Sequence, residues 1–441
     1  MLPGIGIFGS DPISKVLIEI LGHLEFDVHA IWTNISDKET RNLIKSSNLV
    51  TNSIDTVLLN KNVQLVFVCC QPNFHSQICT KALGIGKNVI CLNPTCSDRV
   101  EIEQMIVSAR YYPCLLSSIC FGGLRYLKEY TSLKNKLNLI GDIKVCNITI
   151  NCHNIVMARN QMHQSLSNKK FQLDILSEIV DKINLNVSST SAPGSVNWLS
   201  DKDLGAGVLN RYGAAIISMI LDMLEGKKVT KVFGCLKTLV DTFPESGNGK
   251  NNFTIRKITA DDYCTFQLNL EPGSVLINVC INSLAHSKYS HEINVCGSRG
   301  VLKWIDSNVY HVNFDNYNLN SAIIDSNNNE STYPDSNNEN TVPENDPKSQ
   351  ACEEFLNNYA KIEDTYPELP FLYVRGLYFY LKKVKEKFIE FHNLKSNSKK
   401  SATVPFPSEN LDNFEHTRLI QTVVKSIYQS SCENRWVPVK Y

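Results

Sequence analysis

The first hundred residues alternate between short apolar runs and segments whose apolar side chains recur at helical spacing. Because the apolar runs lack the polar alternation of a half-exposed strand, they indicate strands covered on both faces. The expected strands are Gly4–Phe8, Val28–Trp32, Val63–Cys70 and Asn88–Cys91, and the expected helices are Ile13–Leu24, Glu39–Ser46 and Ser76–Leu83. This order predicts the α/β class, with a Rossmann-type, doubly wound parallel sheet.

The loops that follow these strands should carry the chemistry, since a doubly wound sheet binds its ligand beyond the carboxyl ends of its strands. The first loop is the place for the Gly-x-Gly-x-x-Gly pattern, which lets a pyrophosphate approach a helix N-terminus. Only Gly9 fits, because Asp11 and Ser14 stand at the other two glycine positions. Asp11 either lies beside the phosphates or, in the interpretation we favour, caps the helix with Pro12 in the first turn.

Contacts with a dinucleotide are expected from all four loops. The second strand ends at Thr33 and Asn34 without the acidic residue that contacts an NAD ribose. The sequence therefore predicts NAD or NADP without choosing between them. The predicted cofactor-binding residues are Gly9, Ser10, Asp11, Pro12, Ile13, Thr33, Asn34, Pro72, Asn73, His75, Asn93 and Pro94.

His75 also has a second interpretation. Together with the charged residues Asp201, Lys202 and Asp203 it would supply an acid–base pair near the expected site. The alternative, which we favour, is that His75 caps its helix and the three charges form a solvated loop.

Beyond residue 120 the pattern changes to a second domain. Alternating apolar residues in Cys264–Leu270 and Val275–Ile281 predict half-buried strands. We expect domains at residues 1–120 and 121–441, with insertions near 154–197 and 314–350. Phe171–Asn186 has helical periodicity, whereas Asn318–Gln350 is too polar to offset its ordering entropy and is predicted to be a disordered loop.

Composition narrows the choice of partners. The 441 residues carry no net charge, which argues against nucleic acid as a binding partner. The sequence contains no apolar run of about 18 residues, so it predicts no membrane span. Several of the 15 cysteines, such as Cys69 and Cys70, lie in apolar runs and are expected to be core residues of a protein in a reducing, cytoplasmic compartment. None of the cysteine and histidine spacings is typical of a metal site.

Longer motifs carry a resemblance to a known family. Val63–His75 and Ala82–Pro94 resemble the paired signature of the Gfo/Idh/MocA oxidoreductases. Leu124–Ile143 is similar to that family's interdomain helix and the strand that follows, Cys296–Leu302 to its hairpin, and Phe414–Val439 to its closing helix with Trp436. Tyr111–Pro113, the run LGIGKNVIC and Ile255–Gln267 resemble the animal glucose-fructose oxidoreductase domain-containing proteins in particular.

This resemblance implies a second α/β domain with a large, open, mostly antiparallel sheet, and a homodimer formed through that sheet. It also implies that the family's catalytic lysine, aspartate and histidine fall at Asn93, Arg211 and Ala215. An arginine stays protonated and an alanine has no proton to donate, so no catalytic residue is predicted at these positions. Arg211 either pairs with a buried carboxylate or holds an anionic ligand in the cleft. Trp198 is expected in the core.

Three classes of function remain. The first is a nucleotide-binding protein with degenerate catalysis, which also binds a small anionic or sugar-like ligand. The second is an active NAD(P)-dependent oxidoreductase that acts on a sugar or polyol with relocated acid–base residues. The third is an interaction protein of the extracellular matrix, secreted rather than cytoplasmic, which follows from the resemblance alone.

Overall fold

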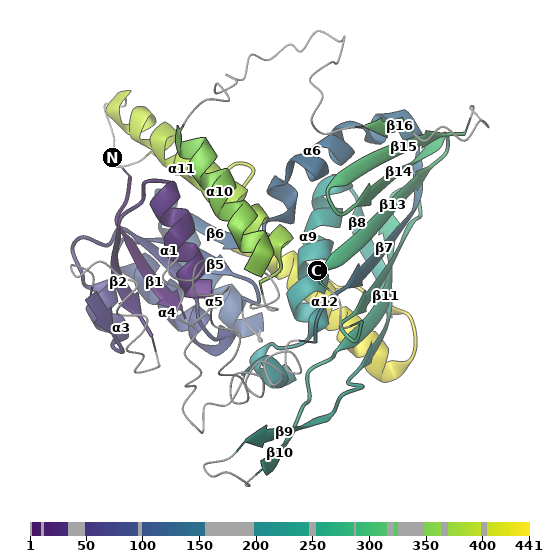
Figure 1. Ribbon diagram of the computed structural model, residues 1–441, viewed down its shortest axis with the longest axis horizontal. Helices are drawn as coiled ribbons and strands as arrows, with labels where there is room; N and C mark the ends of the chain where they lie inside the picture. The colour runs from purple at the N-terminus through teal and green to yellow at the C-terminus, as the bar shows by residue number, and fades with distance from the viewer. Residues whose placement is uncertain are drawn as a thin grey trace.

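The computed structural model describes residues 2–9, 13–33, 49–95, 99–154, 198–246, 253–285, 288–314, 322–324, 347–362, 369–397 and 404–441. Two sheets lie side by side in this structure, each with helices packed against it (Figure 1). The first is built by the N-terminal residues, and the second by residues from the middle of the chain with one short strand near residue 437.

The first sheet has six parallel strands in the order β3-β2-β1-β4-β5-β6. The strands are β1 (Ile5–Gly9), β2 (Val28–Trp32), β3 (Leu49–Thr51), β4 (Leu65–Cys69), β5 (Asn88–Leu92) and β6 (Ser117–Cys120). Every residue of β1 and β4 is buried, as expected for strands covered on both faces. The predicted doubly wound sheet is confirmed.

Successive side chains of these strands point to opposite faces. Phe8, Val66 and Val68 pack with α3 (Ile54–Leu58), α4 (His75–Gly84) and α5 (Arg99–Tyr111) on one face. Ile5, Ile7 and Phe67 pack with α1 (Ile13–His23) on the other. The helix predicted at Glu39–Ser46 lies outside the described residues.

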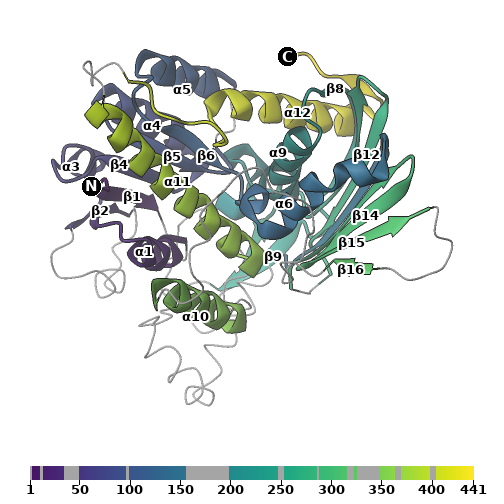
Figure 2. The same ribbon diagram turned by 90° about the horizontal axis from the view of Figure 1, so that it is seen from above.

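The face that carries α1 is completed by helices from far along the chain. These are α10 (Pro347–Ile362) and α11 (Phe371–Asn397), which lie beside α1 in both views (Figures 1 and 2). Tyr380, Leu381 and Val384 of α11 belong to the same buried cluster as Ile5 and Ile7. The domain boundary at residue 120 stays a prediction, but the N-terminal sheet takes part of its core from residues after 346.

Glycines allow α11 to pack closely against the segment that follows β6. Gly376 of α11 lies against Gly123, and a Cβ on Gly376 would lie 2.7 Å from the carbonyl carbon of Gly123. Gly122 has φ of +75° and Gly123 has φ of +71°, a conformation that favours glycine. A Cβ on Gly122 would overlap the ring of Tyr373, so the contact also fixes this tyrosine.

The second sheet has nine strands in the order β16-β15-β14-β13-β7-β12-β11-β8-β17. Only β7 and β12 pair in parallel, so the sheet is mixed and mostly antiparallel, as predicted. The strands are β7 (Ile143–Asn151), β8 (Lys228–Lys237), β11 (Tyr263–Glu271), β12 (Val275–Asn282), β13 (Ser290–Gly297), β14 (Gly300–Ile305), β15 (Asn308–Asn313), β16 (Ala322–Ile324) and β17 (Val437–Pro438).

Helices lie on one face of this sheet, while the opposite face is left open in Figure 1. They are α6 (Lys128–Asn135), α9 (Ala214–Met223) and α12 (Phe414–Glu433). Buried side chains alternate along β11 and β12, which confirms the two strands predicted there. A separate hairpin is formed by β9 (Thr242–Ser246) and β10 (Phe253–Lys257).

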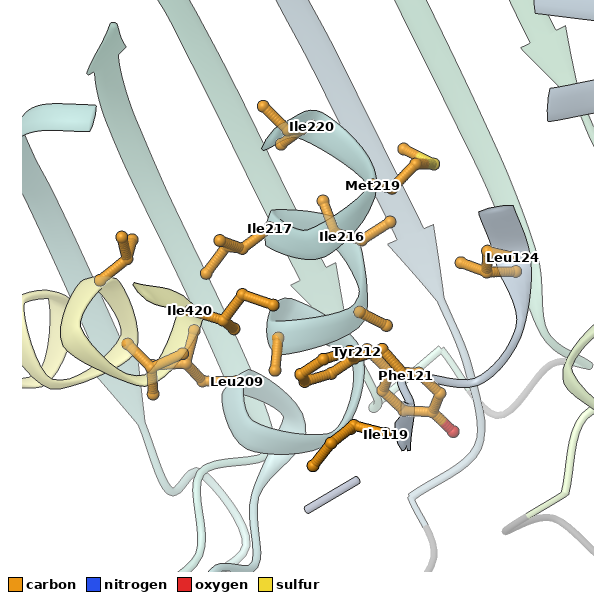
Figure 3. Close-up of a cluster of buried hydrophobic side chains, with 14 of the residues drawn as sticks. Ile119, Phe121, Leu124, Leu209, Tyr212, Ile216, Ile217, Met219, Ile220 and Ile420 are labelled. Carbon is orange, nitrogen blue, oxygen red and sulfur yellow. The ribbon is translucent and has the colours of Figure 1, made fainter. Parts of the chain in front are cut away.

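Where the two sheets meet, α9 is buried among side chains from both. Figure 3 shows Ile216 and Ile220 of α9 in one cluster with Ile119, Phe121 and Ile420. Within the described residues one segment, Lys202–Met223, is long and apolar enough to cross a membrane by length and composition. The most apolar window of this segment is 72% buried inside the protein, as in the core helix of a folded domain.

Two sequence predictions need correction. The segment predicted to be a disordered loop contains β16, and its last residues from Pro347 begin α10. The closing helix does not run to Val439: it ends at Glu433, with Asn434 in the left-handed conformation. Trp436 lies beyond that end, with its ring centroid 5.9 Å from that of Phe233. The helix predicted at Phe171–Asn186 lies outside the described residues.

The prediction that cysteines are core residues is confirmed for eight of them. They are Cys69, Cys70, Cys79, Cys91, Cys120, Cys146, Cys152 and Cys264, all buried in the two main clusters. The compartment stays a prediction.

Candidate functional site

A cavity of about 200 Å³ opens at the carboxyl ends of β1, β4 and β5, between the two sheets. This is the place where a doubly wound sheet binds its ligand. Among the segments that line it are the loops after β4 and β5, residues 198–212 with Ile258–Asp262, and the first turns of α11. The last of these regions comes from more than 250 residues beyond β5.

The wall formed by the first sheet is mostly apolar. Ile13 at the start of α1, Cys69 at the end of β4 and Leu92 at the end of β5 line it. Gly9 lies just behind this wall, and a Cβ there would overlap Ser14 Oγ and Cys69 Sγ. The glycine therefore allows close packing of β1, β4 and α1, which is one role of glycine in dinucleotide-binding turns.

His75 is buried at the base of the cavity, with 1% of its surface exposed. Its Nε2 lies 2.9 Å from the carbonyl oxygen of Cys70, so we place the proton on this nitrogen. Nδ1 is then an acceptor 3.3 Å from Cys91 Sγ. Burial lowers the pKa of His75 to about 4, so its imidazole is neutral at pH 7. The predicted helix cap is wrong, because the side chain bonds to the end of β4.

Asn93 joins the two halves of the cleft. Its Nδ2 donates to the carbonyl oxygens of Asn210, at 2.7 Å, and Arg211, at 3.3 Å. The Oδ1 atom of the same amide is buried and has no hydrogen-bond partner among the described residues. Asn93 thus uses its donor to hold the second domain, and it leaves an acceptor within the cavity lining.

The wall opposite β5 starts with a π-helical turn, η6 (Leu209–Gly213), which leads into α9. Gly205 and Gly207 precede it with φ of +86° and +108°. Such π-helical turns occur often at functional sites. Arg211 and Tyr212 of this turn line the cavity, whereas Ala215 lies one turn further on and is packed in the core at 2% exposure.

Asp261 is one of two buried carboxyl groups that line the cavity. Its Oδ2 accepts from the backbone N–H of Leu209 at 2.9 Å, and its Oδ1 accepts from the Tyr428 hydroxyl at 3.0 Å. A Cβ on Gly207 would overlap this carboxyl group, so the glycine is required for the contact. Burial outweighs these hydrogen bonds and raises the pKa of Asp261 to about 6.

Comparison with known proteins identifies the family. Residues 4–119 match the family model described as an oxidoreductase family with an NAD-binding Rossmann fold, and residues 180–303 match the GFO/IDH/MocA C-terminal domain. The chain is 33% identical over 315 residues, 70% of its length, to glucose-fructose oxidoreductase domain-containing protein 1 of Mus musculus, of which the match covers 68%. The chain belongs to the Gfo/Idh/MocA oxidoreductase family.

Other relatives and solved structures of similar fold agree. Glucose-fructose oxidoreductase domain-containing protein 2 of Homo sapiens is 30% identical over 309 residues, which is 68% of this chain and 67% of the relative. An oxidoreductase domain protein from Kribbella flavida has a TM-score of 0.67 at 17% identity, covering 100% of this chain and 99% of its own. Levoglucosan dehydrogenase in complex with NADH has a TM-score of 0.63 at 13% identity, covering 99% of each chain.

The residues predicted to contact a Gfo/Idh/MocA dinucleotide are only partly brought together. Ile13, His75, Asn93 and Pro94 line the cavity. Gly9 and Thr33 are buried outside the lining, Pro72 lies against Gly205, and Asn73 is exposed. Ser10, Asp11, Pro12 and Asn34 lie outside the described residues, so the prediction that Asp11 caps α1 stays a prediction.

Other expectations for the Gfo/Idh/MocA cleft can now be placed. Asp201 caps a short helical turn by accepting from the backbone N–H of Asp203 at 3.0 Å, and Lys202 and Asp203 are exposed. The solvated loop is therefore confirmed and an acid–base pair with His75 is not formed. Trp198 is half-buried and lines the cavity, so its assignment to the core is wrong.

Several lining residues were not predicted from the sequence, and Asp261 and Tyr373 are two of them. Asp261 belongs to an acidic pair that precedes a strand, a pattern typical of solvent-exposed residues. Tyr373 lies in α11, and no local signal connects that helix to the cleft. Within the described part of the chain, no group of three His, Cys, Asp or Glu side chains is arranged to hold a metal ion.

Proposed function

We propose that this protein binds NAD(H) or NADP(H) in the cleft and has lost the acid–base residues through which its family transfers hydride. The main support for this proposal is Asn93, which stands where the family resemblance places the catalytic lysine. Its amide nitrogen donates to two backbone carbonyl groups of the second domain. A carboxamide has no group that titrates near neutral pH and cannot act as a general acid or base, so Asn93 acts as a tether between domains.

The other two positions support the same conclusion. Arg211 replaces the family's aspartate, and a guanidinium stays protonated. Ala215 replaces the histidine, and it is packed in the core outside the cavity lining. Oxidation of a carbinol needs an acceptor for the hydroxyl proton, and such general bases contribute roughly a hundredfold or more in rate.

Cofactor binding is supported by the shape and chemistry of the first wall. Ile13, Cys69 and Leu92 offer an apolar surface of the kind that accepts a flat heteroaromatic ring. Gly9 permits close packing behind it. Neutral His75 adds no charge to this wall, so a nicotinamide in either redox state meets the same surroundings. When bound, the dinucleotide would supply or accept hydride.

The test is calorimetric titration of the purified protein with NAD, NADH, NADP and NADPH. We expect a dissociation constant below about 100 μM for at least one of them, together with a rise in melting temperature by mass action. The loaded protein is then screened with sugars, polyols and their acids for a change in nicotinamide absorbance. Absence of binding by all four dinucleotides would contradict the proposal, and so would turnover of any of these compounds by the loaded protein.

A second candidate function is favoured by Asp261. A cavity-lining carboxyl group with a pKa of about 6 is suited to accept and return a proton near neutral pH. In that case the protein would be an active oxidoreductase with a relocated base. An Asp261→Asn variant would then bind dinucleotide normally, lose kcat by about a hundredfold and lose the limb of the pH–rate profile near 6. Under the first proposal there is no turnover to lose.

A further inference from the structure

Arg211 places a permanent positive charge in the cleft. It is half-buried in the π-helical turn before α9 and lines the cavity. Its Cζ lies 5.3 Å from the centre of the Tyr212 ring, which is buried beside it. No ion pair of Arg211 is formed with any residue that the structure describes. The structural pair with a buried carboxylate is thus not found within those residues.

The two carboxyl groups that line the cavity accept hydrogen bonds from groups other than Arg211. Asp261 accepts from Leu209 and Tyr428. Asp262 accepts from the backbone N–H groups of Leu239 and Val240 at 2.8 and 2.7 Å. Burial raises the pKa of Asp261, whereas a guanidinium beside it would lower that pKa. The charge of Arg211 is therefore available to a ligand.

Further polar atoms surround the same space. Asn93 Oδ1 is buried and has no hydrogen-bond partner among the described residues, while the buried hydroxyl groups of Tyr212 and Tyr373 interact with Cys152 and Tyr289. All three residues line the cavity with Arg211. Buried polar groups are normally hydrogen-bonded, so the free acceptor of Asn93 in a cavity that also holds the Arg211 guanidinium indicates a site for a polar ligand.

We propose that this cleft selects a small hydroxylated organic anion, with its carboxylate or phosphate group held by Arg211. The inference rests on the proposed function, since the anion would occupy the part of the cleft beside the dinucleotide. A guanidinium binds an oxyanion through two parallel hydrogen bonds, which ammonium groups cannot match. Asn93 Oδ1 accepts a hydrogen bond from one of the hydroxyl groups of the same ligand.

Calorimetry of the full chain tests this charge selection. The probes are D-gluconate, D-glucose 6-phosphate and neutral D-glucose, each titrated with and without saturating NADH. We expect gluconate or glucose 6-phosphate to bind at least about tenfold more tightly than glucose. The gluconate and phosphate titrations show which oxyanion is preferred. Equal binding of all three probes would overturn the proposal.

Variants of Arg211 test whether this residue is responsible for binding the anion. Arg211→Gln should weaken binding of the anion by about tenfold or more, and Arg211→Lys should restore part of it, while NADH affinity stays within about twofold. Arg435→Gln, an exposed arginine outside this cavity, is the matched control and should change neither affinity. Unchanged anion binding by a folded Arg211→Gln protein would overturn the proposal.

The two proposals fail in different ways. Anion binding that depends on Arg211 in a protein that binds no dinucleotide would refute the proposed function and leave this inference standing. Dinucleotide binding without preference for the anionic probes would refute this inference and leave the proposed function standing.

Discussion

Burial shifts the pKa values of two cleft residues in opposite directions. It raises the pKa of Asp261 to about 6 and lowers that of His75 to about 4. In both residues the neutral form is favoured, because a charged form loses solvation in the interior. The consequences for stability have opposite signs and fall in overlapping ranges of pH, so each needs its own variant.

Asp261→Asn should remove a destabilisation that appears as pH rises. The folded-state pKa of Asp261 is raised, so its favourable contribution is complete below the unfolded value and is lost as pH rises through about 6. Relative to the variant, the wild-type free energy of unfolding should fall by about 2 kcal/mol between pH 4 and pH 7. Urea unfolding of both proteins across this range measures the difference. A constant difference would show that Asp261 keeps an ordinary pKa.

His75→Gln should remove a destabilisation that appears as pH falls. The folded-state pKa of His75 is depressed, so its contribution to stability is present above the unfolded value of 6.5 and is lost as pH falls through about 4. Relative to the variant, the wild type should lose about 3 kcal/mol between pH 7 and pH 4. The same unfolding series reports it, and a wild type that gains stability on acidification relative to His75→Gln would contradict the assignment.

At the scale of elements, the contact between Gly123 and α11 decides where the helix lies. Gly376 approaches the backbone of Gly123 directly, and Arg375 of the same helix pairs with buried Glu129. A second half-buried arginine, Arg125, pairs with Asp222 and Asp412. It links the segment after β6 to α9 and to the residue before the N-cap of α12. These contacts hold Tyr373 over the cavity.

Gly376→Ala should therefore destabilise the protein, although alanine is the better helix former. Its Cβ would lie 2.7 Å from backbone atoms of Gly123, which have no flexible side chain to move aside. We expect a loss of about 1–3 kcal/mol in the free energy of unfolding. Gly22→Ala in α1 is the control, because no atom lies within 4 Å of its Cβ position, and it should be neutral or stabilising by up to about 1 kcal/mol. Equal effects of the two changes would refute the close contact.

Elements with a strong local signal could be predicted from the sequence, and those defined by distant contacts could not. Continuous apolar runs such as Leu65–Cys69 indicate burial on both faces, and the alternation in β11 and β12 indicates burial on one. No such signal identifies the sheet against which α11 packs. Helical periodicity shows that one face of a helix is buried, but it does not show what covers that face. The burial of Asp261 and the bonds of Asn93 to the second domain arise in the same way from tertiary contacts.

For the whole molecule, this means that the N-terminal sheet is incomplete without the C-terminal helices. A chain that ends at residue 346 would leave the cluster around Ile5, Ile7 and Phe67 without its contacts from α10 and α11. We expect this truncated protein to bind a hydrophobic dye and to lose its cooperative thermal transition. Circular dichroism and dye fluorescence measure both properties.

Co-expression of residues 347–441 as a separate chain should restore a folded complex. A matched fragment that carries Tyr380→Asp and Leu381→Asp should fail, because both side chains are buried in that cluster. Cooperative unfolding of the truncated chain alone, at the wild-type temperature, would show that α10 and α11 contribute nothing to the N-terminal core.

The position of α11 also matters during synthesis on the ribosome. The strands of the parallel sheet are translated about 250 residues before α11, which completes the cover over one of their faces. At roughly 5–20 residues per second, the nascent chain exposes that apolar face for roughly 10 to 50 seconds. Such a surface is a substrate for chaperones that bind unfolded polypeptides, so the yield of this protein in a cell should depend on how well its emerging first domain is protected.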